Sequence, residues 1–283
     1  MERFRIDPLR NRYVILSPVR KKRPHITEKE PVCPFCPGNE NQTPPEVCRI
    51  EGEDGWKIRV IPNKYPIIPE RHEVVIETPD HHGHLWKLSI DEIRLYLEVL
   101  KERSERIKKL PDVTHIYIFK NHGKSAGASI PHPHTQIIGL PFTPPHIERE
   151  EKILSTDCPL CSHIKLEQYI VLNRGGIVAL CPQFSAFPYQ IWILPEEHTG
   201  SWSRYRDIES IAAALSDVFR GLHRILGPFE FNMLFMDSRH HWRIEIVPRT
   251  TTIGGLELAT STFVNPVPPE EAAEKLKKAL HKG

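Results

Sequence analysis

The chain repeats one order of hydrophobic patterns twice. In each half, apolar and polar residues alternate over short runs, as in half-buried strands, and apolar residues then recur at helical spacing over about 20 positions. The first helical run begins at a capping box, Ser89 with Glu92, and the second spans about residues 206–226. Strand-like runs follow each helix, and PPEEAAEKLKKALHKG predicts a last helix after its prolines. The pattern predicts an α+β fold in two similar halves.

Length, composition and charge mainly exclude certain classes of protein. A chain of 283 residues is long enough for two domains of about 140 residues each. The formal net charge of +2 argues against a polyanionic partner such as nucleic acid. No apolar run approaches the roughly 20 residues that span a bilayer, and the start, MERFRIDPLRNRYV, lacks the apolar stretch of a signal peptide. We therefore expect a cytoplasmic protein with no membrane or nucleic-acid partner.

Four of the six cysteines form two Cys-x-x-Cys pairs. The pairs are Cys33 with Cys36 and Cys158 with Cys161, and two thiolates at this spacing can chelate one tetrahedral Zn²⁺. Each ion then needs two more ligands, typically histidines. A redox-active or merely buried pair is the alternative interpretation.

Histidines follow each cysteine pair at similar distances. After the first pair come ETPDHHGHL, with three histidines, and then HPHTQ; after the second come ILPEEHTGSW and then DSRHHWRIEIVP. Each half thus repeats a Cys-x-x-Cys pair, a histidine roughly 40 residues later, and a strand-borne histidine roughly 40 to 50 further on. The duplicated spacing favours two metal sites over redox pairs.

The run SIPHPHTQIIGLP places two histidines one residue apart in a strand-like segment. Extended backbone alternates its side chains, so we expect His132, His134 and Gln136 on one face and Thr135 and Ile137 on the other. Three polar groups on one face are not typical of a core.

The two halves differ at this run. The first half reads His-Pro-His-x-Gln, and the second reads His241-Trp-Arg243-x-Glu245, so only the first half keeps the second histidine. If the first histidine of each run binds metal, His134 is left free for chemistry. Only one half can then be catalytic.

The loop KNHGKSAGAS precedes the histidine run. Asn121, Gly123, Gly127 and Ser129 form a small-residue turn whose amides and hydroxyl could surround a phosphate. It matches a Walker A motif only in the letters GKS, because Ile118 stands where that motif needs its first glycine. A neutral histidine beside such a turn can attack phosphorus and form a phosphoramidate, which divides one transfer into two steps.

Several segments together carry a family resemblance. They are NHGKSAGASIPHPHTQ, VIPNKYP, ETPDHH, SPVRKKRP, ILPEEH and GGLEL, and the resemblance covers nearly the whole chain, from about residue 5 to 281. The chain thereby resembles the galactose-1-phosphate uridylyltransferase family of the histidine triad superfamily. The resemblance implies two tandem histidine-triad-like domains, each an antiparallel half-barrel sheet with a long helix. Residues 1–150 would form the catalytic domain and residues 151–283 the second, in a homodimer with shared active sites.

The resemblance also implies a reaction. In this family a nucleophilic histidine takes UMP from UDP-glucose and passes it to galactose 1-phosphate in a ping-pong mechanism. That nucleophile falls on His134, whose other ring nitrogen would be held by a backbone carbonyl near His132. The family's phosphate, nucleotide and sugar contacts fall on Ser129, Gln136, Asn63, Asn121, Gly127 and Glu257. Arg20 and Arg23 fall on arginines that contact the sugar phosphate from the other subunit.

The family's metal ligands can be placed in the same way. The first zinc site would have the ligands Cys33, Cys36, His81 and His132. The second would have Cys158, Cys161, His198 and His241, and in some relatives that site holds iron. Because protein groups fill all four tetrahedral positions, both metals would be structural.

Two departures concern the substrate. Phe263 stands where the family has a glutamine that helps to bind sugar hydroxyls. The tail GGLELATSTFVNPVPPE instead resembles ADP-glucose phosphorylase, a relative that passes the nucleotide to inorganic phosphate. Alternative functions are therefore a nucleotide-sugar phosphorylase or a dinucleoside polyphosphate hydrolase. A zinc-dependent nucleic-acid module is disfavoured by the near-neutral charge.

Overall fold

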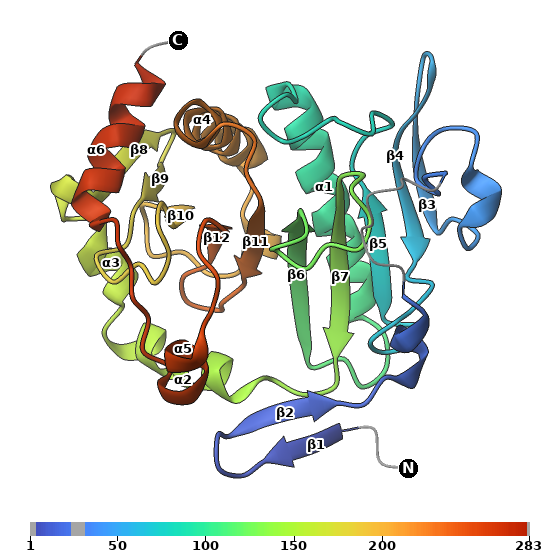
Figure 1. The fold of residues 1–283 in the computed structure, drawn as a ribbon, viewed down its shortest axis with the longest axis horizontal. Coiled ribbons are helices and arrows are strands. Elements are labelled where there is room, and N and C mark those ends of the chain that lie inside the picture. Colours follow the sequence, from blue (N-terminus) through green and yellow to red (C-terminus); the bar gives the residue numbers. More distant parts are fainter. Residues whose placement is uncertain (1–3, 24–31, 282–283) are drawn as a thin grey trace.

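Ten antiparallel strands form one continuous sheet to which both halves of the chain contribute (Figure 1). The computed structural model describes residues 4–23 and 32–281. The first half supplies β3 (Cys48–Gly52), β4 (Gly55–Pro62), β5 (His72–Ile76), β6 (His115–His122) and β7 (His134–Leu140). The second supplies β8 (Ile170–Arg174), β9 (Ile177–Leu180), β10 (Ile191–Pro195), β11 (Phe231–Met236) and β12 (Arg243–Pro248).

The strand order is the same from either end of the sheet. It runs β3-β4-β5-β7-β6-β11-β12-β10-β9-β8, so each strand of the first half has a counterpart at the mirrored position in the second. The halves join where β6 pairs with β11, with Asn121 opposite Asn232. This order reproduces the duplication predicted from the sequence, and the α+β class is confirmed. The division into domains at residues 150 and 151 stays a prediction, and that position lies within α2 (Pro145–Thr156).

Two long helices, one from each half, pack against the sheet (Figure 1). They are α1 (Ile90–Lys108) and α4 (Ile208–Leu226), which contact each other as well as the strands. The predicted capping box starts α1: Ser89 Oγ accepts a hydrogen bond from the amide of Glu92 at 3.2 Å, and the Glu92 carboxylate accepts one from the amide of Ser89 at 2.8 Å. The apolar stripes of both helices are buried in one hydrophobic cluster that crosses the two halves.

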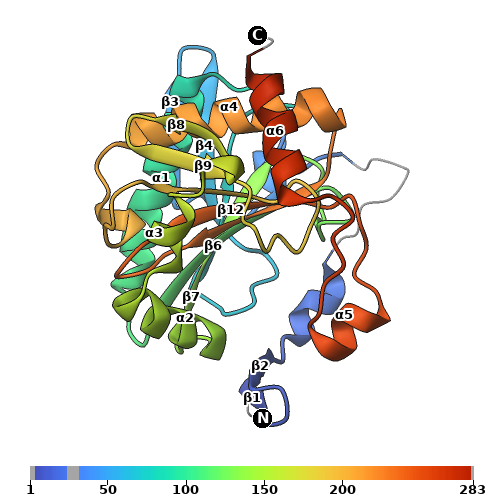
Figure 2. The ribbon, with the colours of Figure 1, turned by 90° about the vertical axis from the view of Figure 1, so that its left-hand side faces the viewer.

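The remaining helices are short or peripheral. The predicted last helix is α6 (Pro269–Leu280), which packs on α4. The sequence did not predict α2, α3 (Pro159–His163) or α5 (Gly255–Thr260). Figure 2 shows α5 and the hairpin of β1 (Phe4–Asp7) and β2 (Arg12–Ile15) at the same end of the molecule. No helix within residues 4–23 and 32–281 combines the length and apolar character needed to cross a membrane.

The two faces of β7 serve different purposes. Thr135 points towards α1, where its hydroxyl lies 2.8 Å from the hydroxyl of Tyr96. His134 and Gln136 point to the opposite face and line a cavity. The predicted alternation is therefore confirmed from His134 onwards. His132 precedes the strand, so the expectation that it belongs to the same extended run was wrong.

Candidate active site and metal centres

The first Cys-x-x-Cys pair lies beside two histidines. The group is Cys33, Cys36, His81 and His132, and its four donor atoms lie within 4.8 Å of one another. Cys36 Sγ is 3.3 Å from His81 Nδ1 and 3.6 Å from His132 Nδ1. Ligands at about 2.3 Å (sulfur) and 2.0 Å (nitrogen) from a tetrahedral ion are about 3.5 Å apart, so this group can hold one metal ion.

The second half builds an equivalent group from Cys158, Cys161, His198 and His241. Cys161 Sγ lies 3.3 Å from His198 Nδ1 and 3.5 Å from His241 Nδ1. These separations match those of the first group. The structure thus brings together each predicted set of four ligands.

A hydrogen bond orients the buried histidine of each group in the same way. His132 Nε2 donates to the carbonyl of Thr78 at 2.8 Å, and His241 Nε2 donates to the carbonyl of Pro195 at 2.9 Å. Donation from Nε2 leaves the Nδ1 lone pair of each ring facing the cysteines, as a metal ligand requires. The donor set therefore fits a metal in both halves.

His134 is held by the backbone of the first metal group. Its Nδ1 lies 2.9 Å from the carbonyl oxygen of His132, so Nδ1 carries the proton and donates, and Nε2 is the basic nitrogen. The ring of Phe35 packs edge-on against it, with centroids 5.4 Å apart. Burial lowers the pKa of His134 to about 4, and the hydrogen bond to His132 opposes this shift. The imidazole is consequently neutral near pH 7, as a nucleophile must be.

A cavity of about 450 Å³ opens next to this imidazole. Five predicted site residues line it, namely Arg23, Asn63, Ser129, His134 and Gln136. The other polar groups include Lys64 and Tyr65, while Phe35, Ile61 and Val74 are apolar. A space of this size, with apolar walls and a few convergent polar groups, is typical of a small-ligand site.

Gln136 is oriented by a histidine that sequence reasoning missed. His72 Nδ1 accepts the amide proton of Ile67 at 3.0 Å, so its Nε2 carries a proton and donates to Gln136 Oε1 at 3.0 Å. Asn63 Nδ2 also donates to Gln136 Oε1, at 3.4 Å. With its oxygen occupied, Gln136 offers its NH₂ group as a donor. In the sequence RHEVVI, His72 has no partner pattern that could have revealed this role.

Arg20 and Arg23 lie near the cavity within one chain. Arg20 Nη1 donates to the carbonyl of Tyr65 at 2.9 Å, and Arg23 Nη2 donates to the carbonyl of Gly127 at 3.2 Å. Only Arg23 lines the cavity. Their predicted action on the active site of another subunit stays a prediction.

The small-residue loop is anchored by Glu230 from the second half. The Glu230 carboxylate accepts hydrogen bonds from the amides of Lys124 at 2.8 Å and Ser125 at 2.7 Å. The amide of Gly127 is used by a turn, donating to the Lys124 carbonyl at 2.9 Å. These amides therefore form hydrogen bonds within the protein. Of the four residues predicted to surround a phosphate, Ser129 lines the cavity. Sequence reasoning missed Glu230 because a carboxylate 105 residues away gives no local signal.

Asn121 and Glu257 lie outside the cavity lining. The Asn121 Oδ1 atom accepts a hydrogen bond from Asn232 Nδ2 at 2.9 Å, across the pairing of β6 with β11. Glu257 caps α5, where its carboxylate accepts the amide proton of Gly254 at 2.9 Å. Within one chain, the structure does not bring these two predicted residues together with His134.

Gly123 permits the close approach of Glu230. Its φ is +85°, and a Cβ atom there would lie 2.3 Å from Glu230 Cγ. We expect Gly123→Ala to lower the free energy of unfolding by about 2 kcal/mol or more, because strain adds to loss of the Glu230 contacts. Gly176→Ala is the matched control, since Gly176 has a φ of +76° but no atom within 4 Å of that position. Denaturant unfolding of both variants checks this, and equal losses would contradict it.

The counterpart of His134 in the second half is a neutralised arginine. Arg243 is 7% exposed and forms ion pairs with Glu245, at 2.6 Å, and with Glu150. Its guanidinium lies 4.9 Å from the ring centroid of Trp192. A guanidinium that is paired with two carboxylates stays protonated and cannot act as a nucleophile. This arrangement agrees with the prediction that only the first half, which contains His134, can be catalytic.

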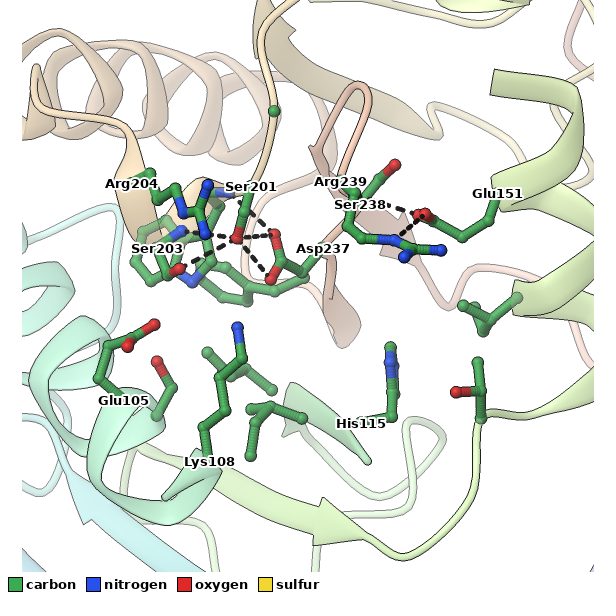
Figure 3. A pocket seen from close by; sticks show the side chains of 18 of the residues that line it. Glu105, Lys108, His115, Glu151, Ser201, Ser203, Arg204, Asp237, Ser238 and Arg239 are labelled. Atoms are coloured by element: carbon green, nitrogen blue, oxygen red, sulfur yellow. Dashed lines mark hydrogen bonds and ion pairs between the residues drawn. The ribbon is translucent and has the colours of Figure 1, made fainter. Parts of the chain in front are cut away.

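A larger cavity of about 660 Å³ lies between α1, β6, β11 and the turn η4 (Trp202–Arg204) (Figure 3). It contains none of the predicted site residues. Three of its charged side chains are paired within the protein: Asp237 accepts hydrogen bonds from Ser201 at 2.8 Å, and Arg239 pairs with Glu151 at 3.3 Å. The cavity at His134 is therefore the candidate active site.

The chain is similar to known proteins over nearly its full length. Residues 15–142 match the N-terminal domain of a domain of unknown function, DUF4931. ADP-glucose phosphorylase from Arabidopsis thaliana is 30% identical over 97% of this chain and 92% of its own length. Galactose-1-phosphate uridylyltransferase from Thermotoga maritima is 28% identical over 98% of both chains.

Solved structures give the same result. The crystal structure of Arabidopsis thaliana ADP-glucose phosphorylase with bound ADP-glucose superimposes with a TM-score of 0.80 and covers 97% of both chains at 30% identity. A structure of a uridylyltransferase mutant superimposes with a TM-score of 0.84, covering 99% of this chain and 98% of the other at 26% identity. The resemblance read from the motifs is confirmed. The chain belongs to the galactose-1-phosphate uridylyltransferase family of nucleotidyltransferases, together with its relative ADP-glucose phosphorylase.

Proposed function

We propose that the protein transfers a nucleotidyl group from a nucleotide sugar to a second phosphate through a covalent intermediate on His134. One observation carries this proposal: the neutral His134 donates its Nδ1 proton to the His132 carbonyl, so its basic Nε2 is available to a ligand in the cavity. The same arrangement fixes the tautomer and the ring orientation. A metal in the first site would hold His132, and through its carbonyl His134, in place.

The reaction would proceed in two displacements. His134 Nε2 attacks the α-phosphorus of the nucleotide sugar, the bond from this phosphorus to the bridging oxygen breaks, and a sugar 1-phosphate leaves with the bonding electrons. An oxygen of the second phosphate then attacks the same phosphorus, and the phosphorus–nitrogen bond breaks to release neutral His134. No oxidant or further reactant is needed.

The surrounding groups fit roles in these steps. The Gln136 NH₂ group and the Ser129 hydroxyl would donate hydrogen bonds to the non-bridging phosphate oxygens. Lys64 lines the same cavity and would offset the charge of the phosphates. Asn63 would contact the nucleoside, and we retain Asn121, Gly127 and Glu257 as proposed substrate contacts. Arg20 and Arg23 would contact the sugar phosphate from the other subunit of a homodimer.

The favoured reaction is transfer of UMP from UDP-glucose to galactose 1-phosphate, in galactose metabolism. Support comes from relatives named galactose-1-phosphate uridylyltransferase, including the Thermotoga maritima protein that matches over nearly its whole length. The alternative is phosphorolysis of ADP-glucose. It is supported by the 30% identity to ADP-glucose phosphorylase and by Phe263 in place of the family's glutamine.

We further propose zinc as the metal in both groups, because sets of two thiolates and two imidazoles favour it. The second site could hold iron instead. A cytoplasmic location completes the proposal, as does the absence of a nucleic-acid partner.

Incubation with UDP-glucose or ADP-glucose, each without acceptor, tests this function. Intact-mass measurement should detect one nucleotidyl adduct per chain, and peptide mapping should place it on His134. A UMP adduct discharged by galactose 1-phosphate supports the uridylyltransferase, and an AMP adduct discharged by inorganic phosphate supports the phosphorylase. If protein with both metals bound forms no adduct with either nucleotide sugar, the covalent mechanism is refuted for these substrates.

A further inference from the structure

Four buried side chains form a hydrogen-bonded network directly behind the His134 site, on the helix side of the sheet. Lys120 Nζ lies 2.7 Å and 2.8 Å from the two carboxylate oxygens of Glu77. Thr135 Oγ1 donates to Glu77 Oε1 at 2.7 Å, and because its proton is used there, it accepts from the Tyr96 hydroxyl at 2.8 Å. All four residues are at most 3% exposed.

The network joins four elements at the level of the nucleophile. Glu77 follows β5, Lys120 is on β6, Thr135 is on β7 and Tyr96 is on α1. Thr135 stands between His134 and Gln136, so its anchored side chain fixes the backbone that carries both. Glu77 acts at a second point, since its amide donates to the Pro133 carbonyl at 3.4 Å.

The second half shows what the fold places at these positions when no nucleophile is present. Gln136 pairs with Phe119 on β6, and Glu245 pairs with Leu234 on β11. The strands are antiparallel, so the residues next to these pairs are Thr135 and Lys120 in the first half, and Ile244 and Phe235 in the second. Thr135 therefore corresponds to Ile244, and Lys120 corresponds to Phe235.

The two remaining members also have apolar counterparts. The carbonyls of Thr78 and Pro195 accept equivalent hydrogen bonds from the metal-site histidines. Glu77 precedes Thr78 and Leu194 precedes Pro195, so these two residues correspond. The helix caps Ser89 and Asp207 likewise equate Tyr96 with Ala214. All four counterparts are at most 2% exposed, namely Leu194, Ala214, Phe235 and Ile244.

This internal comparison argues that the network is not needed for folding. Burying an ion pair carries a desolvation cost, and well-packed apolar residues at the same positions are often equally or more stabilising. The second half adopts the same strands and helix with apolar residues there. A polar network confined to the half with His134 points to a role in the chemistry at that site.

We propose that Glu77, Tyr96, Lys120 and Thr135 are positioning residues, which hold the backbone of residues 132–136 so that His134 Nε2 is aligned with the reacting phosphorus. This inference rests on the proposed function. The four side chains lie on the opposite face of the sheet from the cavity and act through His134, without touching the substrate. Misplacement of a reacting atom by about 1 Å can cost about 100-fold in rate.

The paired variants Thr135→Val and Thr135→Ser test the proposal. Valine keeps the shape of threonine but removes the hydroxyl, so we expect the rate of nucleotidyl adduct formation at saturating substrate to fall about 10- to 100-fold. KM and metal content should change little, the thermal midpoint should fall because the buried Tyr96 hydroxyl loses its acceptor, and Thr135→Ser should restore most of the rate. An unchanged rate in Thr135→Val, or a loss that serine does not restore, would overturn the proposal.

A second pair separates positioning from stability. Lys120→Met breaks the network, whereas Arg103→Met breaks another largely buried ion pair, 2.6 Å from Glu73, that joins α1 to β5 and lies outside the network. We expect both to lower the thermal midpoint and only Lys120→Met to lower the rate. Equal rate losses in the two variants would show a general effect of destabilisation and refute positioning.

A readout without substrate keeps this inference distinct from the proposed function. The Nδ1 proton that His134 donates to the His132 carbonyl should give a downfield proton NMR signal, assignable by its loss in His134→Ala. The signal should broaden or exchange faster in Thr135→Val and recover in Thr135→Ser. If wild-type protein forms no adduct, the proposed function fails, and an unchanged NMR signal in Thr135→Val would independently refute positioning.

Discussion

Replacing His134 by alanine is expected to abolish nucleotidyl transfer while the fold and both metal groups remain intact. The substitution removes the nucleophile, and His134 is the only imidazole among the described residues that line the cavity. Turnover should fall by roughly four to six orders of magnitude, as for other enzymes that lose a nucleophile. Steady-state rates with both nucleotide sugars, together with intact mass after incubation, measure the loss of turnover and of adduct.

A matched control is available on α4. His223 also bonds a backbone carbonyl through Nδ1, at 3.0 Å from the Gly227 oxygen, but lies outside the cavity. His223→Ala should keep the rate near that of the unchanged protein. Substantial turnover or a retained adduct in His134→Ala would exclude the covalent mechanism on this residue.

The second large effect is expected from the metal groups, and it should differ between the two halves. Replacing Cys33 or Cys158 by serine should each release about one metal equivalent and lower the thermal midpoint by about 10 °C or more, because a structural zinc site contributes several kcal/mol. Only Cys33→Ser should also slow adduct formation, about 100-fold at 25 °C, because His132 both belongs to this group and orients His134.

Elemental analysis, thermal unfolding and adduct kinetics on the same samples check this. Cys48→Ser provides the control, since Cys48 lies on β3 outside both groups. A Cys158→Ser variant that loses activity as strongly as Cys33→Ser, measured below its unfolding transition, would contradict the separation of roles. An unchanged metal content in either variant would contradict the ligand assignment.

The metal groups and the nucleophile could be predicted because each depends on closely spaced residue types. Cys-x-x-Cys and His-Pro-His carry their geometry within four and three residues, the duplication indicated where distant histidines recur, and the family resemblance selected the ligands among them. Helix α1 was equally accessible, because the Ser89 capping box is local. His72 and Glu230 were missed since their roles arise from long-range pairing: the first acts on Gln136, 64 residues away, and the second on Ser125, 105 residues away.

The buried network was hidden for a related reason. Lys120 and Glu77 read as ordinary charged residues in strand-like runs, and only the order of β5, β7 and β6 brings them together. The sequence indicated that β6 and β7 are neighbouring strands, but it did not place β5 beside β7, because alternation of apolar residues identifies strands and not their distant partners. Glu257 illustrates the opposite case: the motif suggested a sugar contact, whereas within one chain its side chain caps α5.

The pairing of β6 with β11 at the centre of the sheet also bears on aggregation. A separate half would end in an open edge strand, whose unpaired N–H and C=O groups can recruit other chains. Joining the halves pairs these two edges with each other, and within residues 4–23 and 32–281 β3 and β8 are the margins of this sheet. Those margins carry charges that discourage further strand addition: Arg49 lies 3.6 Å from Glu51 on β3, and Arg174 on β8 pairs with Asp217 at 2.8 Å. Duplication thus protects the sheet as well as building the site.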